Sequence, residues 1–346
     1  MLKRNYSQIE YFNQMAKKNK PLMSFDAKNI DEWKVWKTRF KRKLFQLLGE
    51  FPKEKTQLNV ESLGKVDEGD YIREKVVFNS EPDSSVPAYI LIPKNIKKGE
   101  KRPALLCAHG HGQFGKDSVA GITNNESNRI NSIKEANYDY GKQFALKGYV
   151  TIIPDWRGFG ERDDGGTPYH GRDKCNVHFI RGSLLGVNLL MLDLWDGIRT
   201  IDYLVSRPEI DSKRIGCIGL SFGGTMTTYM AIVEPRIKAA CICCYVSTFY
   251  SYAISMGNFC GSQYIPGLYK YGDLSDVYSL IAPKPLLFEY GIQDMGFPVK
   301  DARESVQKTL KNYKIAGVPE KVDYDEFDGG HQFSGRKAFD FFDKWL

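Results

Sequence analysis

A serine stands at position 221 in the run GLSFGG, where an apolar, strand-like segment at 214–220 leads directly into a helical pattern. The Gly-x-Ser-x-Gly spacing puts small residues on both sides of Ser221, so the chain can turn sharply from strand to helix. Such a turn exposes the hydroxyl and aims the positive end of the helix dipole at it. In this strand, turn and helix setting, the sequence predicts that Ser221 is a nucleophile.

A serine hydroxyl needs a base to take its proton and a third group to orient that base. With this type of serine motif the usual chain order is nucleophile, acid, histidine, so the base should follow the last strand. Among five histidines, His331 in FDGGHQF has that position. The alternative is a structural role, in which His331 only caps the final helix. Asp294 is the expected acid because it is the one carboxylate between the seventh strand and Pro298, with Asp301 in the next helix as the alternative.

The negative oxygen that forms during such a reaction needs two peptide N–H donors. One should be the N–H of Phe222, directly after the nucleophile, and the other should come from the loop after the third strand, HGHG at 109–112. We assign it to His111, with Gly112 as the alternative. A metal-binding His109-x-His111 pair is disfavoured because the remaining histidines fit no ligand spacing. Both histidines are then expected to shape the pocket.

A charged pair follows the fourth strand in PDWRGFGER. Asp155 and Arg157 could contact substrate, but we expect them to form a loop-stabilising ion pair, since such pairs are common near the ends of sheets.

Short apolar runs typical of strands recur along the chain and position these residues. The eight expected strands are 72–78, 86–92, 104–108, 150–154, 214–220, 237–246, 285–290 and 321–327. Helical patterns at 138–146, 184–205, 222–233, 300–313 and 334–346 separate or follow most of them. This alternation predicts an α/β fold with a mostly parallel sheet covered on both faces. The short EPDSS link between the first two strands indicates an antiparallel pair at one edge.

Residues 247–283 break the alternation, because they are rich in Tyr, Gly and Ser and lack a clear period. A loop of this length inside a domain is uncommon unless it is functional, so we expect a cap inserted after the sixth strand. It should lie over the carboxyl ends of the strands, where α/β sheets bind ligands. The residues expected to line the acyl pocket, and to favour acetyl to butyryl groups, are Phe259, Cys260, Tyr264, Ile265 and Pro266.

The basic charge of the chain is concentrated in an N-terminal extension. Residues 1–60 carry a net charge of +8, whereas the whole chain carries +7, so residues 61–346, the expected catalytic domain, carry a net charge of −1. An amphipathic helix is expected at 29–48, packed on the main domain or on a second subunit. No nucleic-acid motif accompanies the charge, which favours a solvated face.

No run of about 18 apolar residues is present, and the N-terminus lacks the apolar block of a signal peptide. We therefore expect a cytoplasmic protein, without a membrane or nucleic-acid partner, that is a possible homo-oligomer. Seven cysteines without a paired C-x-x-C motif are expected to be reduced, space-filling thiols. No metal and no cofactor are implied.

Taken together, the runs HGHG, YVTIIPDWRGFGER, GLSFGG, FCGSQYIPGLYKYGDLSDVYSLIAPKPLLFEYG and GGH resemble the acetyl xylan esterase-like and dienelactone hydrolase-like branch of the α/β-hydrolase superfamily. The resemblance spans roughly residues 70–346. It implies the α/β-hydrolase fold, with Ser221, Asp294 and His331 as the triad and the His111 and Phe222 amides as the oxyanion hole. This chain departs from the branch in two places. Dienelactone hydrolases have a cysteine nucleophile where this chain has Ser221, and the cephalosporin-deacetylating esterases have H-G-Y-N where this chain has HGHG.

The expected function is a serine carboxylesterase that acts on small esters, including acetylated sugars. Two alternatives remain open at this point. The first is a peptidase similar to the prolyl oligopeptidases, which share G-x-S-x-G-G, although no propeller-like domain precedes residue 61. The second is a binding protein on an inactive hydrolase fold, which would need a lost triad member.

Overall fold

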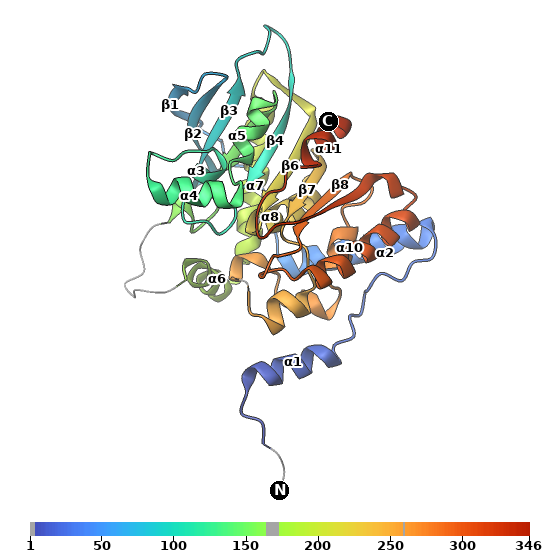
Figure 1. The fold of residues 1–346 in the computed structure, drawn as a ribbon. Helices are drawn as coiled ribbons and strands as arrows, with labels where there is room; N and C mark the ends of the chain where they lie inside the picture. Colours follow the sequence, from blue (N-terminus) through green and yellow to red (C-terminus); the bar gives the residue numbers. More distant parts are fainter. Residues whose placement is uncertain (1–3, 164–172, 259) are drawn as a thin grey trace.

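A single twisted sheet carries the residues singled out above (Figure 1). In this computed structural model, which describes residues 4–163, 173–258 and 260–346, the sheet order is β1-β2-β3-β5-β4-β6-β7-β8-β9. From β5 to β9 every neighbouring pair is parallel, whereas β1, β2, β3 and β5 pair antiparallel. The strands are β1 (Glu61–Asp67), β2 (Tyr71–Glu81), β3 (Ser84–Pro93), β4 (Arg102–Ala108), β5 (Val150–Pro154), β6 (Ile210–Leu220), β7 (Ile237–Cys243), β8 (Leu286–Gly291) and β9 (Val322–Phe327).

All eight expected strands are present, but the sheet has a ninth. Every residue of β1 is exposed, so this strand has no apolar alternation that the sequence could reveal. The β2–β3 pair is antiparallel as expected, but β1 and not β2 forms the edge.

Helices cover both faces of the sheet (Figure 1). One buried cluster contains residues of α2 (Ile30–Leu48), α7 (Leu189–Ser206), α8 (Phe222–Val233), α9 (Leu274–Ser279) and α10 (Val299–Ile315). The cluster on the opposite face contains residues of α3 (Lys116–Val119), α5 (Tyr140–Leu146) and α11 (Ala338–Trp345). The remaining α-helices are α1 (Gln8–Lys18), α4 (Ser127–Ala136) and α6 (Lys174–Leu184).

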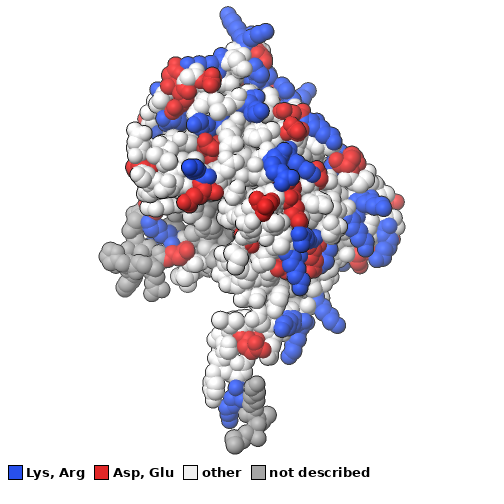
Figure 2. Space-filling model, in the orientation of Figure 1, with Lys and Arg blue, Asp and Glu red and all other residues white. Residues whose placement is uncertain are grey.

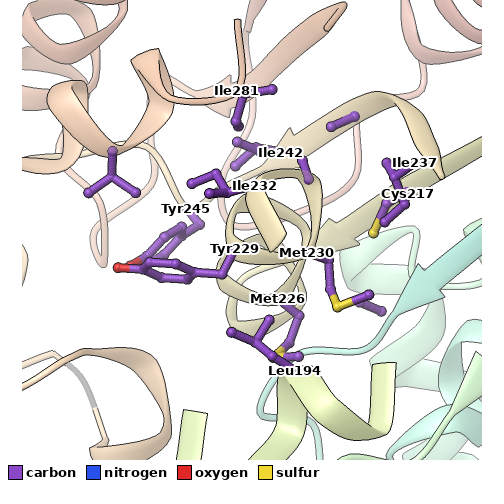
Figure 3. Packing of buried hydrophobic residues seen from close by; sticks show 14 of the residues in the cluster. Leu194, Cys217, Met226, Tyr229, Met230, Ile232, Ile237, Ile242, Tyr245 and Ile281 are labelled. Atoms are coloured by element: carbon purple, nitrogen blue, oxygen red, sulfur yellow. The ribbon is translucent and has the colours of Figure 1, made fainter. Parts of the chain in front are cut away.

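The helix behind the predicted nucleophile is buried along nearly its whole length. Met226, Tyr229 and Met230 of α8 lie beneath the sheet, with Leu194 of α7 against them (Figure 3). Because α8 is held by close packing, the serine that precedes it has a fixed position relative to β6.

One expected helix is shorter than predicted. The pattern at 184–205 begins as α7 only at Leu189, because Gly186 has a positive φ of 74° and the Asn188 side chain accepts a hydrogen bond from Leu190 N at 2.9 Å. This is a turn followed by a helix cap. The final helix likewise begins at Ala338 and not at Ser334.

The N-terminal extension contains two helices with different surroundings. Trp33, Trp36, Phe40, Leu44 and Leu48 of α2 are buried, as the amphipathic pattern predicted, and α2 packs on the main domain. In contrast, α1 projects from the body (Figure 1), and the surface of this projection shows few charged side chains (Figure 2).

The segment expected to form a cap is built from short helical turns. They are η2 (Phe249–Ser255), η3 (Gly261–Gln263), η4 (Leu268–Lys270) and α9. The chain that leads into α2 lies along this segment, where Leu22 N and Met23 N donate to the carbonyl oxygens of Lys270 and Tyr271.

Within the described ranges, no single helix is long and apolar enough to cross a membrane. The pair α6 and α7 meets the criteria of length and composition only when joined, and it is bent by 100°.

Candidate active site

Ser221 lies at the turn between β6 and α8, in a backbone conformation that side chains rarely adopt. Its φ is 63° and its ψ is −120°. The flanking glycines are required by space: a Cβ at Gly223 would lie 1.9 Å from the carbonyl oxygen of Ala108, and one at Gly219 would lie 2.3 Å from that of Gly223. The expected sharp turn is therefore present, and it brings the serine close to the end of β4.

The two other expected triad members meet directly. Nδ1 of His331 donates to Oδ2 of Asp294 at 2.7 Å. The second oxygen, Oδ1, accepts from the peptide N–H groups of Gly296 and Phe297 at 2.8 and 3.1 Å. The Phe297 ring stacks on the imidazole with 5.7 Å between centroids and 12° between planes. The carboxylate thus fixes the ring so that Nε2 is the atom left to accept a proton.

The alternative acid has another partner. Oδ2 of Asp301, in the first turn of α10, accepts from the hydroxyl of Ser251 at 2.8 Å. It therefore ties α10 to η2, and the geometry favours Asp294 as the acid beside His331.

The loop after β4 contains the candidate oxyanion donor. The N–H of Gly110 is already used, because it donates to Oη of Tyr138 at 2.7 Å. His111 follows at the edge of the same cavity as Ser221. The N–H of Phe222 is the first of α8, a position without an intrahelical acceptor. These two amides are therefore compatible with the expected oxyanion hole.

His109 differs from the expectation that it shapes the pocket. It is fully buried, its Nε2 accepts from Trp156 N at 3.1 Å, and its Nδ1 lies 2.8 Å from the Gly110 carbonyl. Burial lowers the pKa of this imidazole to about 4. His109 is a neutral tie between the β4 and β5 loops, so the His109-x-His111 metal pair is not formed.

Asp155 and Arg157 stabilise the loop after β5, but they do so through separate networks and not as one pair. Asp155 is buried and bonds Lys116 Nζ at 2.6 Å. Arg157 makes two hydrogen bonds to Asp196, at 2.8 and 2.9 Å, and also pairs with Glu81. Neither residue lines the cavity at Ser221.

Ser221, Asp294 and His331 line one cavity of about 650 Å³. Much of its remaining wall is polar, with side chains that the sequence reasoning did not single out: Asp173, Asn258, Gln263 and Gln293. Phe297 and Met295 supply apolar surface, and Met295 is 85% exposed at the rim. No local sequence motif marks these residues, because they come from α6, the cap and the β8 loop.

The expected acyl-pocket residues have different positions. Cys260 lines the cavity, whereas Phe259 lies outside the described residues. Tyr264 and Ile265 line a second cavity, together with Phe12 and Met15 of α1. Pro266 is exposed. Of the described residues in this group, Cys260 is the one that lines the cavity at Ser221.

Cys260 also belongs to a polar cluster at the cavity wall. Its Sγ lies 2.7 Å from Nε2 of His111 and 2.7 Å from Oγ of Ser262. Hydrogen bonding with Cys175 lowers the pKa of Cys260, and His111 acts in the same direction against the effect of burial. All seven cysteines are free thiols, as expected, but these two are not simply space-filling.

The sequence and the fold can both be compared with known proteins. The model of the Abhydrolase family matches residues 3–338. YtaP of Bacillus subtilis (strain 168), provisionally named a hydrolase, is 26% identical over 318 residues, which cover 88% of this chain and 98% of YtaP.

Two solved structures have a similar fold. A Bacteroides fragilis NCTC 9343 protein, provisionally named an acetyl xylan esterase, is 18% identical with a TM-score of 0.76, covering 97% of this chain and 84% of that one. Glucuronoyl esterase from Solibacter usitatus is 13% identical with a TM-score of 0.68, covering 94% of this chain and 98% of that one. At these identities the likeness concerns the fold.

Proposed function

The chain belongs to the Abhydrolase family and has the α/β-hydrolase fold, and from that premise we propose that it is a serine esterase. The observation that carries the proposal is that Ser221 lines the same cavity as the hydrogen-bonded His331–Asp294 pair. A nucleophile, a base and the group that orients the base are the parts that acyl transfer requires.

In the proposed first step, Oγ of Ser221 attacks the ester carbonyl while Nε2 of His331 takes the hydroxyl proton. The Asp294 carboxylate stabilises the imidazolium that forms, and it is itself held by two peptide N–H groups. The N–H groups of His111 and Phe222 donate to the oxyanion of the tetrahedral intermediate. Collapse of the intermediate transfers the His331 proton to the leaving alcohol and leaves the acyl group on Ser221.

In the second step a water molecule gives a proton to His331 and attacks the acyl carbon. The tetrahedral intermediate then breaks its bond to Oγ, and His331 returns the proton to Ser221. Product acid leaves through the open side of the cavity, where Met295 is exposed.

We infer that the substrates are esters of short acids with a hydroxyl-rich alcohol. Asp173, Asn258, Gln263 and Gln293 offer hydrogen bonds suited to a sugar, and Phe297 supplies apolar surface for a short acyl group. Each methylene that fails to fit is expected to reduce binding in the transition state by about 1–3 kcal/mol. The esterase names of the two similar structures are consistent with this substrate class.

The test measures kcat/KM for p-nitrophenyl esters of increasing acyl length, for acetylated sugars and for aminoacyl amides. We expect acetyl to butyryl esters to be preferred. Ser221→Ala and His331→Ala should each lower kcat by about 10⁴ to 10⁶.

Hydrolysis of aminoacyl amides without ester hydrolysis would instead support a peptidase. Failure of every substrate, with Ser221 unreactive to a fluorophosphonate probe, would favour a binding protein. Retention of activity by Ser221→Ala would reject the proposed nucleophile.

A further inference from the structure

We propose that His111, Cys175 and Cys260 form a binding site for a thiophilic divalent metal ion such as Zn²⁺ at the wall of the active-site cavity, and that occupancy inhibits the enzyme. The three residues come from the β4–α3 loop, the first turn of α6 and the cap. Nε2 of the histidine and Sγ of both cysteines lie within 4.8 Å of one another.

The donor set has the chemistry of a zinc site. One imidazole and two thiolates are soft ligands that Zn²⁺ prefers, and a fourth position would remain for water or another group. Around a tetrahedral zinc ion, sulfur and nitrogen ligands are about 3.4–3.8 Å apart. The contact of 2.7 Å between His111 and Cys260 must therefore lengthen by about 1 Å, which a small movement of the exposed imidazole provides.

The surroundings hold two of the ligands in place. The Cys260 sulfur has a second contact, with the Ser262 hydroxyl, which can donate to a metal-bound thiolate. Oδ1 of Asn176, the residue after Cys175, accepts a hydrogen bond at 2.8 Å from the N–H of Gly261, the residue after Cys260. At Gly261 a Cβ would lie 2.2 Å from the Phe179 side chain, so α6 and the cap are in close contact there.

The site is also accessible. His111 and Cys260 line the cavity that contains Ser221, whereas Cys175 is buried behind them. An ion can therefore reach two of the three donor residues from the cavity.

Inhibition follows from this location. A metal ion on the His111 side chain would occupy part of the cavity and would pull on the loop whose N–H is the proposed oxyanion donor. The inhibition rests on the proposed esterase function, but the metal binding does not.

The first experiment titrates Zn²⁺ into the EDTA-treated, fully reduced chain in competition with a chromophoric chelator. We expect one Zn²⁺ per chain, and with Co²⁺ an ultraviolet thiolate-to-metal charge-transfer band. Cys175→Ser and Cys260→Ser should each weaken zinc binding about 100-fold. His111→Gln removes the third ligand at an exposed side chain, so it should also weaken zinc binding without disturbing the core. Thermal unfolding of each metal-free variant checks that it folds.

Three further variants locate the ion. Zinc binding should be unchanged in Cys217→Ser, a buried thiol on β6, and in Ser221→Ala, which has no esterase activity under the proposed mechanism. It should also persist in His331→Ala, because Cys244, Asp294 and His331 are a competing donor group. Binding that is lost in His331→Ala but kept in Cys175→Ser would overturn the proposal, as would no binding at all.

The second experiment measures ester hydrolysis at increasing zinc occupancy, with each variant compared with its own metal-free rate. We expect at least tenfold inhibition of the natural chain, and none of Cys175→Ser at the same zinc concentration. Stoichiometric binding with full activity would refute the inhibition while the binding site stands. An inactive chain that still binds one Zn²⁺ would refute the esterase alone.

Discussion

Asp294 and Asp301 are close in sequence, yet their side chains serve different contacts. Asp294 holds His331 and is itself held by the amides of Gly296 and Phe297, whereas Asp301 bonds Ser251. A carboxylate can keep the catalytic imidazole in the right tautomer only where it touches that ring.

We therefore expect Asp294→Asn to lower kcat by about 10³ to 10⁴, since the amide favours the wrong imidazole tautomer. Asp301→Asn, the matched control, should change kcat less than about tenfold. Steady-state kinetics on p-nitrophenyl acetate decide between them. An active Asp294→Asn with an inactive Asp301→Asn would reverse the assignment of the acid.

Glu289 is a buried carboxyl on β8 that the proposed mechanism does not use. Its Oε2 accepts from the Cys243 thiol at 3.5 Å, and among the described residues its Oε1 has no hydrogen-bond partner. Burial, and then the neighbouring Asp325, raise its pKa from 4.5 to about 7. Below pH 4.5 this group is protonated in both states, whereas between pH 4.5 and 7 the unfolded chain ionises first. Stability is therefore lost as the pH rises through that window.

Glu289→Gln removes this titration. Relative to the natural chain, the variant should therefore be more stable at pH 8 than at pH 5. The change in its relative free energy of unfolding should be on the order of 1–3 kcal/mol, and its relative Tm should rise accordingly. Calorimetric scans at the two pH values measure it. Glu320→Gln, which replaces an exposed carboxyl, is the control. Its Tm should differ from that of the natural chain by the same amount at both pH values. A larger gain at pH 5 would contradict the pKa direction.

The shared location of Ser221, Asp294 and His331 could be predicted from sequence because each follows a strand within four residues, and the carboxyl ends of parallel strands lie at one edge of the sheet. The polar wall of the cavity could not. Asp173 and Gln263 reach the cavity only through the packing of α6 on the cap, and the sequence has no local signal for that contact. For the same reason the sequence does not reveal that Tyr264 and Ile265 line a different cavity, next to α1.

At the scale of elements, α2 acts as part of the core. Trp36 stacks on Phe40 with 5.4 Å between centroids, and its Nε1 donates to the Met23 carbonyl at 2.8 Å. Phe40 reaches Gly272, where a Cβ would lie 2.6 Å from its ring. The helix therefore packs against the cap segment at Gly272.

Trp36→Ala should lower the free energy of unfolding by about 3–5 kcal/mol, because it leaves a cavity and removes a buried hydrogen bond. Val35→Ala, one position away and 58% exposed, should change it by less than about 0.5 kcal/mol. Urea unfolding followed by circular dichroism gives both values. Equal effects of the two changes would mean that α2 is not docked as described.

The apolar periodicity predicted α2 and most strands because the buried face of each of these elements consists of apolar residues. It missed β1 because an exposed edge strand has no such face, and it missed α1 for a similar reason. Five large apolar residues in and just before α1 are exposed, so the pattern has no buried side to indicate: Tyr6, Ile9, Tyr11, Phe12 and Met15.

At the scale of the whole molecule, the boundary expected at residue 60 separates two regions of different charge, but one buried cluster spans it. The buried cluster that includes α2 continues through β2, β6, α8 and α10. Residues 61–346 without α2 would expose the apolar side chains that it covers.

We therefore expect a chain that begins at Glu50 to aggregate, or to unfold at least about 10 °C below the natural chain, because several large side chains lose their partners. A chain that begins at Lys20, which lacks α1 only, should lose much less. Differential scanning calorimetry of the three chains provides the comparison. Equal Tm values for the natural chain and the Glu50 chain would restore residues 61–346 as an independent unit.

The backbone conformation of Ser221 affects which substitutions at this position are favoured during evolution. A serine at φ 63° and ψ −120° is strained by about 1–3 kcal/mol, whereas glycine adopts such angles freely and loses only about 1 kcal/mol through the flexibility of its unfolded chain. Mutation to glycine at this position would therefore favour folding and, under the proposed mechanism, abolish catalysis. Under that mechanism, selection for a stable fold acts against the serine, and selection for turnover retains it.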